Sequence, residues 1–399
     1  MKQKSTGRKP WCRLRHRLIQ ALLRPAFRLY CRFKYGFTAR PYRDKRQVLA
    51  IMNHQTAFDQ FFVSLVLGRP VYFLASEDLF SMGLLSRLLS FATAPIPIRK
   101  SATDVRAVMT AKRVAREGGT IAVFPEGNRT YSGRTGYIKE SIAPFIRALG
   151  LPVAILACRG GYGVQPRWSD GCRRGRMTAE VTSVLEPWEY AELSDDELFA
   201  LISRLLYADE GRVTGEYRGN RLAEHLERCI YYCPFCGMAA HESLGNFITC
   251  LSCRHTVEYL PTKELLGVER PHPYRFVTEW YDAQESALRS LDLTPYLDAP
   301  LFCDTVDVYE CEVGEKKRRT AEGATLLGYA DRFLVGGETL SFSEVTGVSV
   351  LGRNKLNIYV GARVVQLAGA PSLNVLKYMN LYYSVKEREG REHAGFLGI

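Results

Sequence analysis

The chain has 399 residues, enough for two or three domains with separate hydrophobic cores. Its 46% hydrophobic and 24% charged residues exclude an intrinsically disordered chain. The net charge of +12 would suit a nucleic-acid-binding protein, but fifteen Lys and Arg and only one acid, Asp44, fall within residues 1–50. The positive charge is therefore a local property of the N-terminal segment and not of the whole fold.

Cysteine content and hydropathy indicate the compartment. The eleven cysteines are not preceded by a secretory signal, so we expect a reducing, cytosolic environment and no disulfide framework. Arginines interrupt the apolar stretch near the N-terminus, which makes it neither a signal peptide nor a transmembrane span of ~20 residues. If a membrane is involved, the protein is therefore expected to lie on it, as a peripheral or monotopic protein at its cytoplasmic face.

Residues 1–45 are predicted to form basic amphipathic helices that dock on a membrane. Arginines separate the apolar side chains, and Pro25 is expected to divide the segment into two helical pieces. Such an apolar stripe can simply pack on the main domain. Because aromatic residues accompany the arginines, we favour an interfacial helix pair whose arginines face anionic lipid head groups. The stripe comprises Trp11, Leu14, Leu18, Leu22, Ala26, Leu29 and Phe33.

Residues 46–227 are predicted to form an α/β domain with a mostly parallel, mixed sheet and flanking helices, because short apolar runs alternate with helical patterns. In sheets of this kind, functional residues gather in the loops at the strand ends. The expected strands are 48–53, 71–75, 94–98, 120–124, 152–158 and 178–185. The expected helices are 58–67, 81–91, 103–117, 139–149 and 193–207.

Two further modules are expected after this domain. Residues 228–262 contain four clustered cysteines and are predicted to form a zinc ribbon. Residues 263–399 contain short alternating apolar runs between 325 and 366 and a helical pattern at 372–386, which is typical of a small antiparallel β module with a closing helix. This module weakly resembles a PH- or GRAM-like lipid-surface domain, and an ordinary small β domain of another purpose is the alternative.

The first candidate site follows the strand expected at 48–53. His54 is suited to accept a proton near neutral pH, and a carboxylate on the other ring nitrogen would fix its tautomer and stabilise the imidazolium. Asp59 lies five residues on, so the two would not share a helical face. We therefore expect His54 in a strand-to-helix turn and Asp59 in the first turns of the helix, reaching back. Taken alone, the pair is better explained as a buried His and an Asp that favours a helix N-terminus.

The second candidate site, residues 124–130 (FPEGNRT), ends another expected strand. Pro125 and Gly127 enforce a turn that strand packing does not need, and Glu126 and Arg129 are expected to project from it. The planar guanidinium of Arg suits a phosphate or carboxylate because it donates two hydrogen bonds at once. The alternative is a surface turn with a local Glu–Arg pair.

Together the two motifs resemble the glycerolipid acyltransferase superfamily, whose best-known members are the 1-acylglycerol-3-phosphate acyltransferases. The first family motif, His and Asp separated by four residues and usually preceded by Asn, matches residues 53–59. The third, Phe-Pro-Glu-Gly-Thr-Arg-Ser, matches residues 124–130 with two departures, Asn128 and Thr130. The resemblance covers roughly residues 11–215. Looser matches are a strand ending in Arg99, for the second motif, and residues 151–155, for the fourth.

The resemblance implies an enzyme of phospholipid biosynthesis. It would move a fatty acyl group from acyl-CoA or acyl-carrier protein to the free hydroxyl of a lysophospholipid, first of all 1-acylglycerol-3-phosphate. Other lysophospholipids, glycerol 3-phosphate and amino-lipid hydroxyls stay open as acceptors. His54 would be the general base and Asp59 would orient it, without an acyl-enzyme, and no Gly-x-Ser-x-Gly elbow occurs in the sequence. Acceptor binding is implied for Arg99, Glu126, Gly127 and Arg129.

Four cysteines predict a structural zinc site. Cys233 and Cys236 form one Cys-x-x-Cys pair, and Cys250 and Cys253 form a second, at the spacing of a tetrahedral zinc ribbon. Gly237 permits the tight turn that follows the first pair. A redox dithiol and plain core cysteines are the alternatives. A closed site of four Cys implies structural Zn²⁺, and no catalytic metal is expected.

A non-catalytic adaptor that binds lipid or nucleic acid through the basic arm and the ribbon is the alternative from another functional class. Arg254 is the only Lys or Arg between residues 229 and 258, which argues against nucleic acid. The retained pair of His54 and Asp59 also argues against an adaptor. We expect the ribbon to join the catalytic unit to the C-terminal module.

Overall fold

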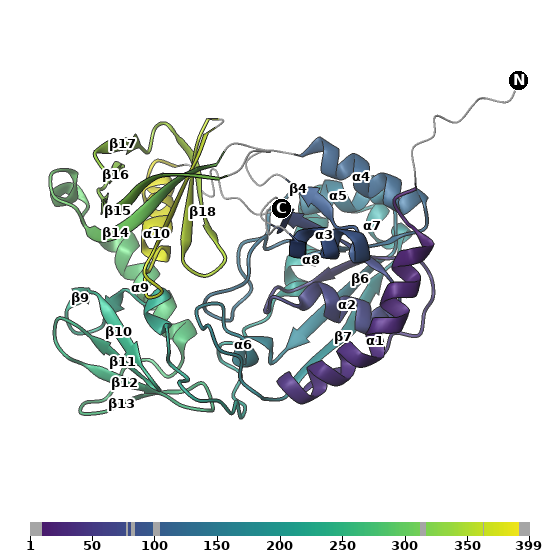
Figure 1. The fold of residues 1–399 in the computed structure, drawn as a ribbon, viewed down its shortest axis with the longest axis horizontal. Coiled ribbons are helices and arrows are strands. Elements are labelled where there is room, and N and C mark those ends of the chain that lie inside the picture. The colour runs from purple at the N-terminus through teal and green to yellow at the C-terminus, as the bar shows by residue number, and fades with distance from the viewer. Residues whose placement is uncertain are drawn as a thin grey trace, which may run out of the picture.

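The protein is described by a computed structural model. An α/β part lies beside a β-rich part that contains the cysteine cluster (Figure 1). Arg99, which was matched to the second family motif, lies outside the described residues. The described residues are 10–76, 79–80, 84–98, 104–311, 317–361 and 363–390.

A seven-stranded mixed sheet forms the centre of the α/β part, in the order β1-β7-β6-β2-β5-β3-β4. The strands from β6 to β4 are parallel, β7 is antiparallel to β6, and β1 is parallel to β7. The predicted mostly parallel, mixed sheet is therefore confirmed. Its strands are β1 (Phe37–Ala39), β2 (Leu49–Met52), β3 (Val71–Ser76), β4 (Ile96–Ile98), β5 (Thr120–Val123), β6 (Val153–Arg159) and β7 (Met177–Leu185).

Helices cover both faces of this sheet because successive strand side chains point to opposite faces. Ala50 and Met52 of β2 belong to the core that includes α1 and α2, whereas Leu49 and Ile51 belong to the core with α4, α5 and α8. Burial on both faces explains why the strands read as continuous apolar runs. The helices are α1 (Leu14–Tyr35), α2 (Asp59–Leu67), α3 (Leu84–Thr93), α4 (Val105–Arg116), α5 (Ile142–Leu149), α6 (Gly161–Val164), α7 (Pro187–Ala191) and α8 (Asp195–Leu206).

Helix α1 shows that one prediction was wrong. Pro25 lies inside one continuous helix and does not divide the segment. Both halves of α1 are anchored, because His16 Nδ1 lies 3.2 Å from the Tyr72 hydroxyl in one half and Cys31 and Tyr35 are buried in the other. This packing on either side of the proline offsets the backbone hydrogen bond that proline cannot make.

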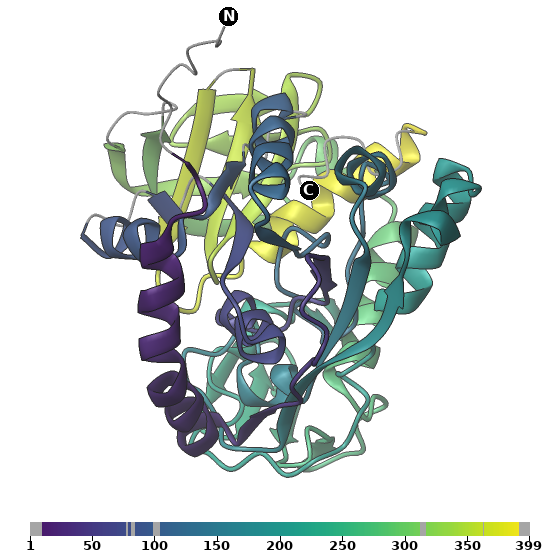
Figure 2. The ribbon, with the colours of Figure 1, turned by 90° about the vertical axis from the view of Figure 1, so that its right-hand side faces the viewer.

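The apolar stripe of α1 faces solvent and not the core. Leu18, Leu22 and Phe33 are 61%, 79% and 64% exposed, and α1, drawn in purple, lies at the edge of the molecule in Figure 2. Helix α3 lies beside α1 and adds the exposed ring of Phe91, over which Arg15 lies at 4.2 Å. Among the described helices, none combines the length and apolarity that spanning a bilayer requires.

Two small sheets carry the cysteine cluster. One is the hairpin of β8 and β9, and the other has four antiparallel strands in the order β10-β11-β12-β13. Gly237 has φ +81°, which confirms the tight left-handed turn expected after the first cysteine pair. The strands are β8 (Tyr232–Cys233), β9 (Gly237–Met238), β10 (His241–Leu244), β11 (Phe247–Cys250), β12 (Thr256–Tyr259) and β13 (Leu265–Gly267).

A second seven-stranded sheet, wholly antiparallel, and a closing helix form the C-terminal module, as the alternating pattern predicted. The strand order is β17-β16-β15-β14-β20-β19-β18. The elements are α9 (Val277–Ser290), β14 (Phe302–Cys311), β15 (Arg318–Gly328), β16 (Arg332–Val335), β17 (Glu338–Ser341), β18 (Val345–Leu351), β19 (Lys355–Val360), β20 (Arg363–Gly369) and α10 (Leu376–Arg388), with short 3₁₀ turns at Leu226–Arg228 and Thr294–Leu297.

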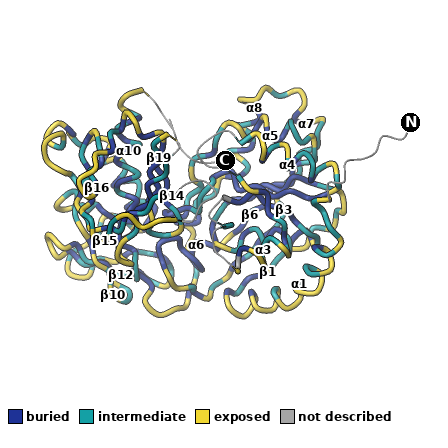
Figure 3. Tube along the Cα trace, turned by 45° about the horizontal axis from the view of Figure 1, so that its top comes forward, coloured by how far each residue is buried: buried dark blue, intermediate teal, exposed yellow. Residues whose placement is uncertain are grey.

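One hydrophobic core joins the ribbon, α9, α10 and the second sheet. It also takes in Tyr131 and Trp168 from the α/β part, which are 6% and 0% exposed. Buried segments, in dark blue, occupy the interior of both parts in Figure 3. The C-terminal module is therefore packed on the α/β part through shared apolar side chains. The predicted domain limits at 45, 227 and 262 stay predictions.

Candidate active site

Parallel strand pairing brings the sequence motifs together. β2 pairs with β5 on one side and with β6 on the other, and all three run in the same direction. The loops that follow their carboxyl ends therefore lie side by side. Asn53 extends this pairing beyond β2, since its side chain donates to the Cys158 carbonyl at 3.1 Å and accepts the Cys158 N–H at 2.8 Å.

His54 and Asp59 form a hydrogen-bonded pair in the first of these loops. His54 Nδ1 lies 2.8 Å from Asp59 Oδ2. Asp59, the first residue of α2, is fully buried and also accepts the backbone N–H groups of Gln55 and Thr56 at 2.7 and 2.9 Å. The Thr56 hydroxyl donates to its other oxygen at 2.5 Å. The structure thus places His54 in the turn and Asp59 in the first helical turn, where the five-residue spacing put them.

The surroundings of His54 favour a neutral, oriented base. A carboxylate on Nδ1 selects the tautomer in which Nδ1 carries the hydrogen and Nε2 offers its lone pair. The Phe124 ring stacks on the imidazole with centroids 4.7 Å apart. Burial lowers the pKa of His54, Asp59 opposes this change, and the charges of Arg129 and Arg167 add to it. The imidazole is therefore unprotonated near neutral pH and can accept a proton.

Glu126 clamps two loops together and does not project from the surface as expected. It is 3% exposed, Oε1 accepts the His54 N–H at 2.7 Å, and Oε2 accepts the Gly136 N–H at 2.8 Å. Among the described residues no ion pair joins Glu126 to Arg129, so the alternative of a local surface pair fails. Acceptor binding by Glu126 stays a prediction, while its support of the His54 backbone is observed.

Arg129 offers an unsatisfied positive charge beside this pair. Its buried Nη1 has no hydrogen-bond partner in the described part of the chain. Burial, followed by the charges of Arg167 and Arg353, lowers the pKa of Arg129 to about 10. The turn before it is closed by the Gly127 N–H, which donates to the Phe124 carbonyl at 2.9 Å with φ +65° at the glycine. Neighbouring guanidinium groups with an unmet donor are suited to bind an anion.

Arg167 is part of the site although the sequence analysis missed it. It is 4% exposed and donates to the carbonyl oxygens of Arg129 at 2.8 Å, Gly352 at 2.9 Å and Val350 at 2.7 Å. The last two belong to the hairpin of β18 and β19, so Arg167 joins the site to the C-terminal module. Arg353, in the same hairpin, was also missed. The only available signal for Arg167 was its place in the loop after a predicted strand.

The comparisons with known proteins concern the segment that carries both motifs. The family model described as Acyltransferase matches residues 36–159. The chain contains an acyltransferase-family domain. Chloroplastic 1-acyl-sn-glycerol-3-phosphate acyltransferases of Brassica napus and Arabidopsis thaliana are each 24% identical to this chain over 122 residues, which is 30% of it and 35% and 34% of theirs. The chain thus spans about a third of the length of the curated relatives it matches.

A solved structure is also similar to the chain. It is the 1-acyl-sn-glycerophosphate acyltransferase PlsC from Thermotoga maritima, at 18% identity and a TM-score of 0.39, covering 47% of this chain and 74% of that one. The family match ends at Arg159, the last residue of β6. Arg167, the cysteine cluster and the C-terminal module therefore lie outside the matched segment.

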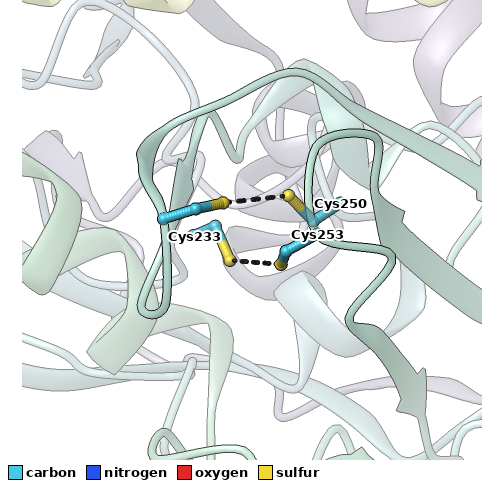
Figure 4. Close-up of side chains that lie close together, drawn as sticks. Cys233, Cys250 and Cys253 are labelled. Atoms are coloured by element: carbon cyan, nitrogen blue, oxygen red, sulfur yellow. Dashed lines mark hydrogen bonds between the residues drawn. The ribbon is translucent and has the colours of Figure 1, made fainter.

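The four predicted zinc ligands come together beside the acyltransferase domain. Cys233 Sγ lies 3.6 Å from Cys253 Sγ, Cys236 Sγ lies 3.5 Å from Cys250 Sγ, and all four sulfur atoms are within 4.8 Å of one another (Figure 4). A disulfide would need ~2.05 Å. A tetrahedral zinc with Zn–S bonds of ~2.3 Å has S–S edges of about 3.8 Å. The donor set therefore fits zinc, and Arg270 Nη2 donates to Cys253 Sγ at 3.2 Å from outside the cluster.

The carboxyl of Glu126 gives a pH-dependent prediction for stability. Burial raises its pKa from 4.5 to about 7, although two backbone N–H groups donate to it. A carboxyl with a higher pKa in the folded chain stabilises the fold fully below 4.5, and this stabilisation is lost as the pH rises through 7. The stability of the wild type relative to Glu126→Gln should therefore fall between about pH 5 and pH 8, by on the order of 3 kcal/mol.

Urea unfolding of both proteins at the two pH values measures this change. Glu192→Gln, at an exposed glutamate, controls for the loss of one surface charge. The free energies of unfolding of the wild type and Glu126→Gln are compared. If their difference stayed constant, or grew in favour of the wild type as the pH rose, the raised pKa of Glu126 would be contradicted.

Proposed function

We propose that the protein transfers a fatty acyl group from a thioester donor, acyl-CoA or acyl-carrier protein, to the free hydroxyl of a lysophospholipid. The observation that carries the proposal is the contact of 2.8 Å between His54 Nδ1 and Asp59, near Arg129, whose buried Nη1 has no hydrogen-bond partner among the described residues. The acyltransferase domain and the names of the curated relatives support the reaction class, and they make 1-acylglycerol-3-phosphate the first acceptor to test. Other lysophospholipids, glycerol 3-phosphate and amino-lipid hydroxyls are the further acceptors.

In the proposed mechanism the acceptor's own oxygen is the nucleophile. His54 Nε2 takes the hydroxyl proton as the oxygen attacks the thioester carbonyl carbon, and Asp59 stabilises the resulting imidazolium. The carbon–sulfur bond then breaks, and the imidazolium returns the proton to the leaving thiolate. Arg129 binds the acceptor's phosphate and so holds the hydroxyl near the base. The new ester and a free thiol are the products.

The proposed role of His54 as the general base predicts the effect of replacing it. His54→Ala should lower kcat by about a thousandfold or more, because a positioned base contributes 10²–10⁴ in rate and the oriented pair is lost with it. Asp59→Asn should lower kcat as well, since the amide cannot accept all four donors that reach the carboxylate. Transfer is measured with radiolabelled acyl-CoA and 1-acylglycerol-3-phosphate.

Two controls accompany this measurement. His225→Ala removes another histidine that lies near carboxylates, 3.2 Å from Asp170 and from Glu227, and should keep its activity within about twofold. Circular dichroism melting establishes that the His54 variant is folded. Turnover of a folded His54→Ala protein at the wild-type rate would refute the mechanism.

We propose that α1 and α3 dock the enzyme on the cytoplasmic face of a membrane. The exposed stripe of α1 would enter the acyl boundary. At 100° per residue, Arg28 and Arg32 lie between this stripe and the packed face of the helix, where they would meet anionic head groups. These arginines line a groove of about 550 Å³ against β1. The outward direction of the stripe supports docking over packing on the main domain.

Docking predicts a loss of vesicle binding when the stripe becomes charged. The double variant Leu18→Asp/Leu22→Asp should bind vesicles of phosphatidylcholine and phosphatidylglycerol at least roughly tenfold more weakly, because two leucines no longer insert. The matched control is Leu244→Asp/Leu266→Asp, two leucines of the ribbon that are 80% and 55% exposed. Cosedimentation measures binding, and equal losses in the two double variants would argue against the docking face.

We propose that the cysteine cluster binds one structural Zn²⁺ through Cys233, Cys236, Cys250 and Cys253. The metal would cross-link the hairpin of β8 and β9 to the end of β11. Cys236→Ser should lose the zinc and lower Tm by several degrees, because metal binding contributes to folding. Cys303→Ser, at an exposed cysteine outside the cluster, should keep both. Elemental analysis and thermal melting test the proposal. Wild-type protein that contains no metal, and whose Tm does not change when zinc is added, would refute it.

A further inference from the structure

A cavity of about 320 Å³ lies between the acyltransferase domain and the C-terminal module. Residues 126–137 form one wall, to which Glu126 and Arg129 contribute. α9 and α10 form the other, to which Arg289 and Asn380 contribute. The volume lies at the lower end of the range for small-molecule sites. The cavity is thus made jointly by the family domain and by a module outside the matched segment.

The cavity borders the proposed acyl-transfer site. Glu126 lines it and also accepts the backbone N–H of His54 at 2.7 Å. Arg129, another lining residue, is close enough to His54 for its charge to lower the pKa of the imidazole. A group bound in the cavity would therefore contact the loop that supports the base.

The two walls of the cavity differ in how their positive charges are satisfied. On the loop wall, Arg134 is paired with Asp282 by contacts of 2.8 and 2.5 Å. The buried Nη1 of Arg129 has no such partner among the described residues. On the helix wall, Arg289 is 59% exposed and lies 3.3 Å from Glu387 and 3.8 Å from Glu285, two carboxylates that also line the cavity. Pairs with so exposed a guanidinium are weak and easily opened. The cavity thus offers one unmet cation and one that is loosely held.

The alternative is that the cavity is only a packing defect between two modules. A packing defect would not require the guanidinium groups of Arg129 and Arg289. A buried donor without a partner costs about 1–3 kcal/mol, so folded proteins keep one mainly where a ligand or water completes it. A phosphate is the matching anion, because its oxygens accept several guanidinium N–H groups at once.

Hydrogen bonds to the C-terminal hairpin hold the two walls in place. Arg167 donates to the carbonyls of Arg129 and Gly352, and the Tyr131 hydroxyl donates to the Arg353 carbonyl at 2.7 Å. Figure 1 shows β18 on the side of the C-terminal module that is next to the α/β part. The helix wall therefore has a defined position relative to Arg129, as a preformed binding site requires.

We propose that this cavity binds the phosphate-bearing head group of the acceptor, with Arg129 and Arg289 as its two cations. The inference rests on the proposed acyl transfer and adds the C-terminal module to the acceptor site. Arg289 would contact the head group and not the reacting atoms. It would therefore set acceptor affinity and leave the chemical step unchanged.

The test uses the full-length protein and glycerol 3-phosphate as a soluble probe. Calorimetry compares the wild type with Arg289→Gln and with Arg275→Gln, the matched control. Arg275 lies just before α9, is 65% exposed and pairs with Glu264 at 2.7 Å, but it is not among the residues that line the cavity. Arg289→Gln should raise Kd about tenfold, since a hydrogen bond to a charged group is lost, and Arg275→Gln should leave it unchanged. Glycerol, which lacks the phosphate, should show no such dependence.

Kinetics give the second readout. With 1-acylglycerol-3-phosphate, Arg289→Gln should raise the acceptor KM about tenfold while kcat and the donor KM stay the same. A Kd and an acceptor KM within twofold of the wild type, with binding still weakened by Arg129→Gln, would overturn the inference and leave the acyl-transfer proposal standing. Absence of transfer to every lysolipid would overturn the proposed function instead, while Arg289-dependent binding of glycerol 3-phosphate would still support an anion site in the cavity.

Discussion

The parallel pairing of β2 with β5 and β6 is the constraint on which the site depends. Because the three strands run in the same direction, their loops meet at one edge of the sheet and bring together His54, Glu126 and Arg167. The strands are buried on both faces, so a slip of register would disturb two cores at once. The hydrogen bond between Glu126 and the His54 backbone then makes the two motifs a single structure.

The sequence predicted most elements of the α/β part, though not β1, α6 and α7, and it predicted the contact of His54 with Asp59. Continuous apolar runs mark strands buried on both faces, and the five-residue spacing excluded a shared helix face. Pro25 within a continuous helix was not predicted, because the contacts of His16 and Cys31 that support it are tertiary. The clamping role of Glu126 was missed for a related reason, since its partners are backbone N–H groups that almost every residue carries.

The C-terminal module makes contacts that local sequence patterns cannot predict. Arg167 and its partner Gly352 are separated by 185 residues, and their contact leaves no pattern at either position. The antiparallel strands and closing helix were visible as alternating and helical periods, but the direction in which the hairpin points was not. The order of its elements is compatible with the proposed PH- or GRAM-like character. That likeness stays a proposal, while the hydrogen bonds from Tyr131 and Arg167 to the hairpin are observed.

The core that Tyr131 and Trp168 share with the ribbon and α10 has a consequence for how the chain folds. A chain ending after the first sheet would expose these aromatic side chains to water, because the apolar residues that now cover them would be missing. Tyr131, just after residues 124–130, and Arg167 would also lose the hairpin carbonyl oxygens to which they donate. Expression of the α/β part alone is therefore unfavourable, because part of its apolar surface is covered only by the C-terminal module.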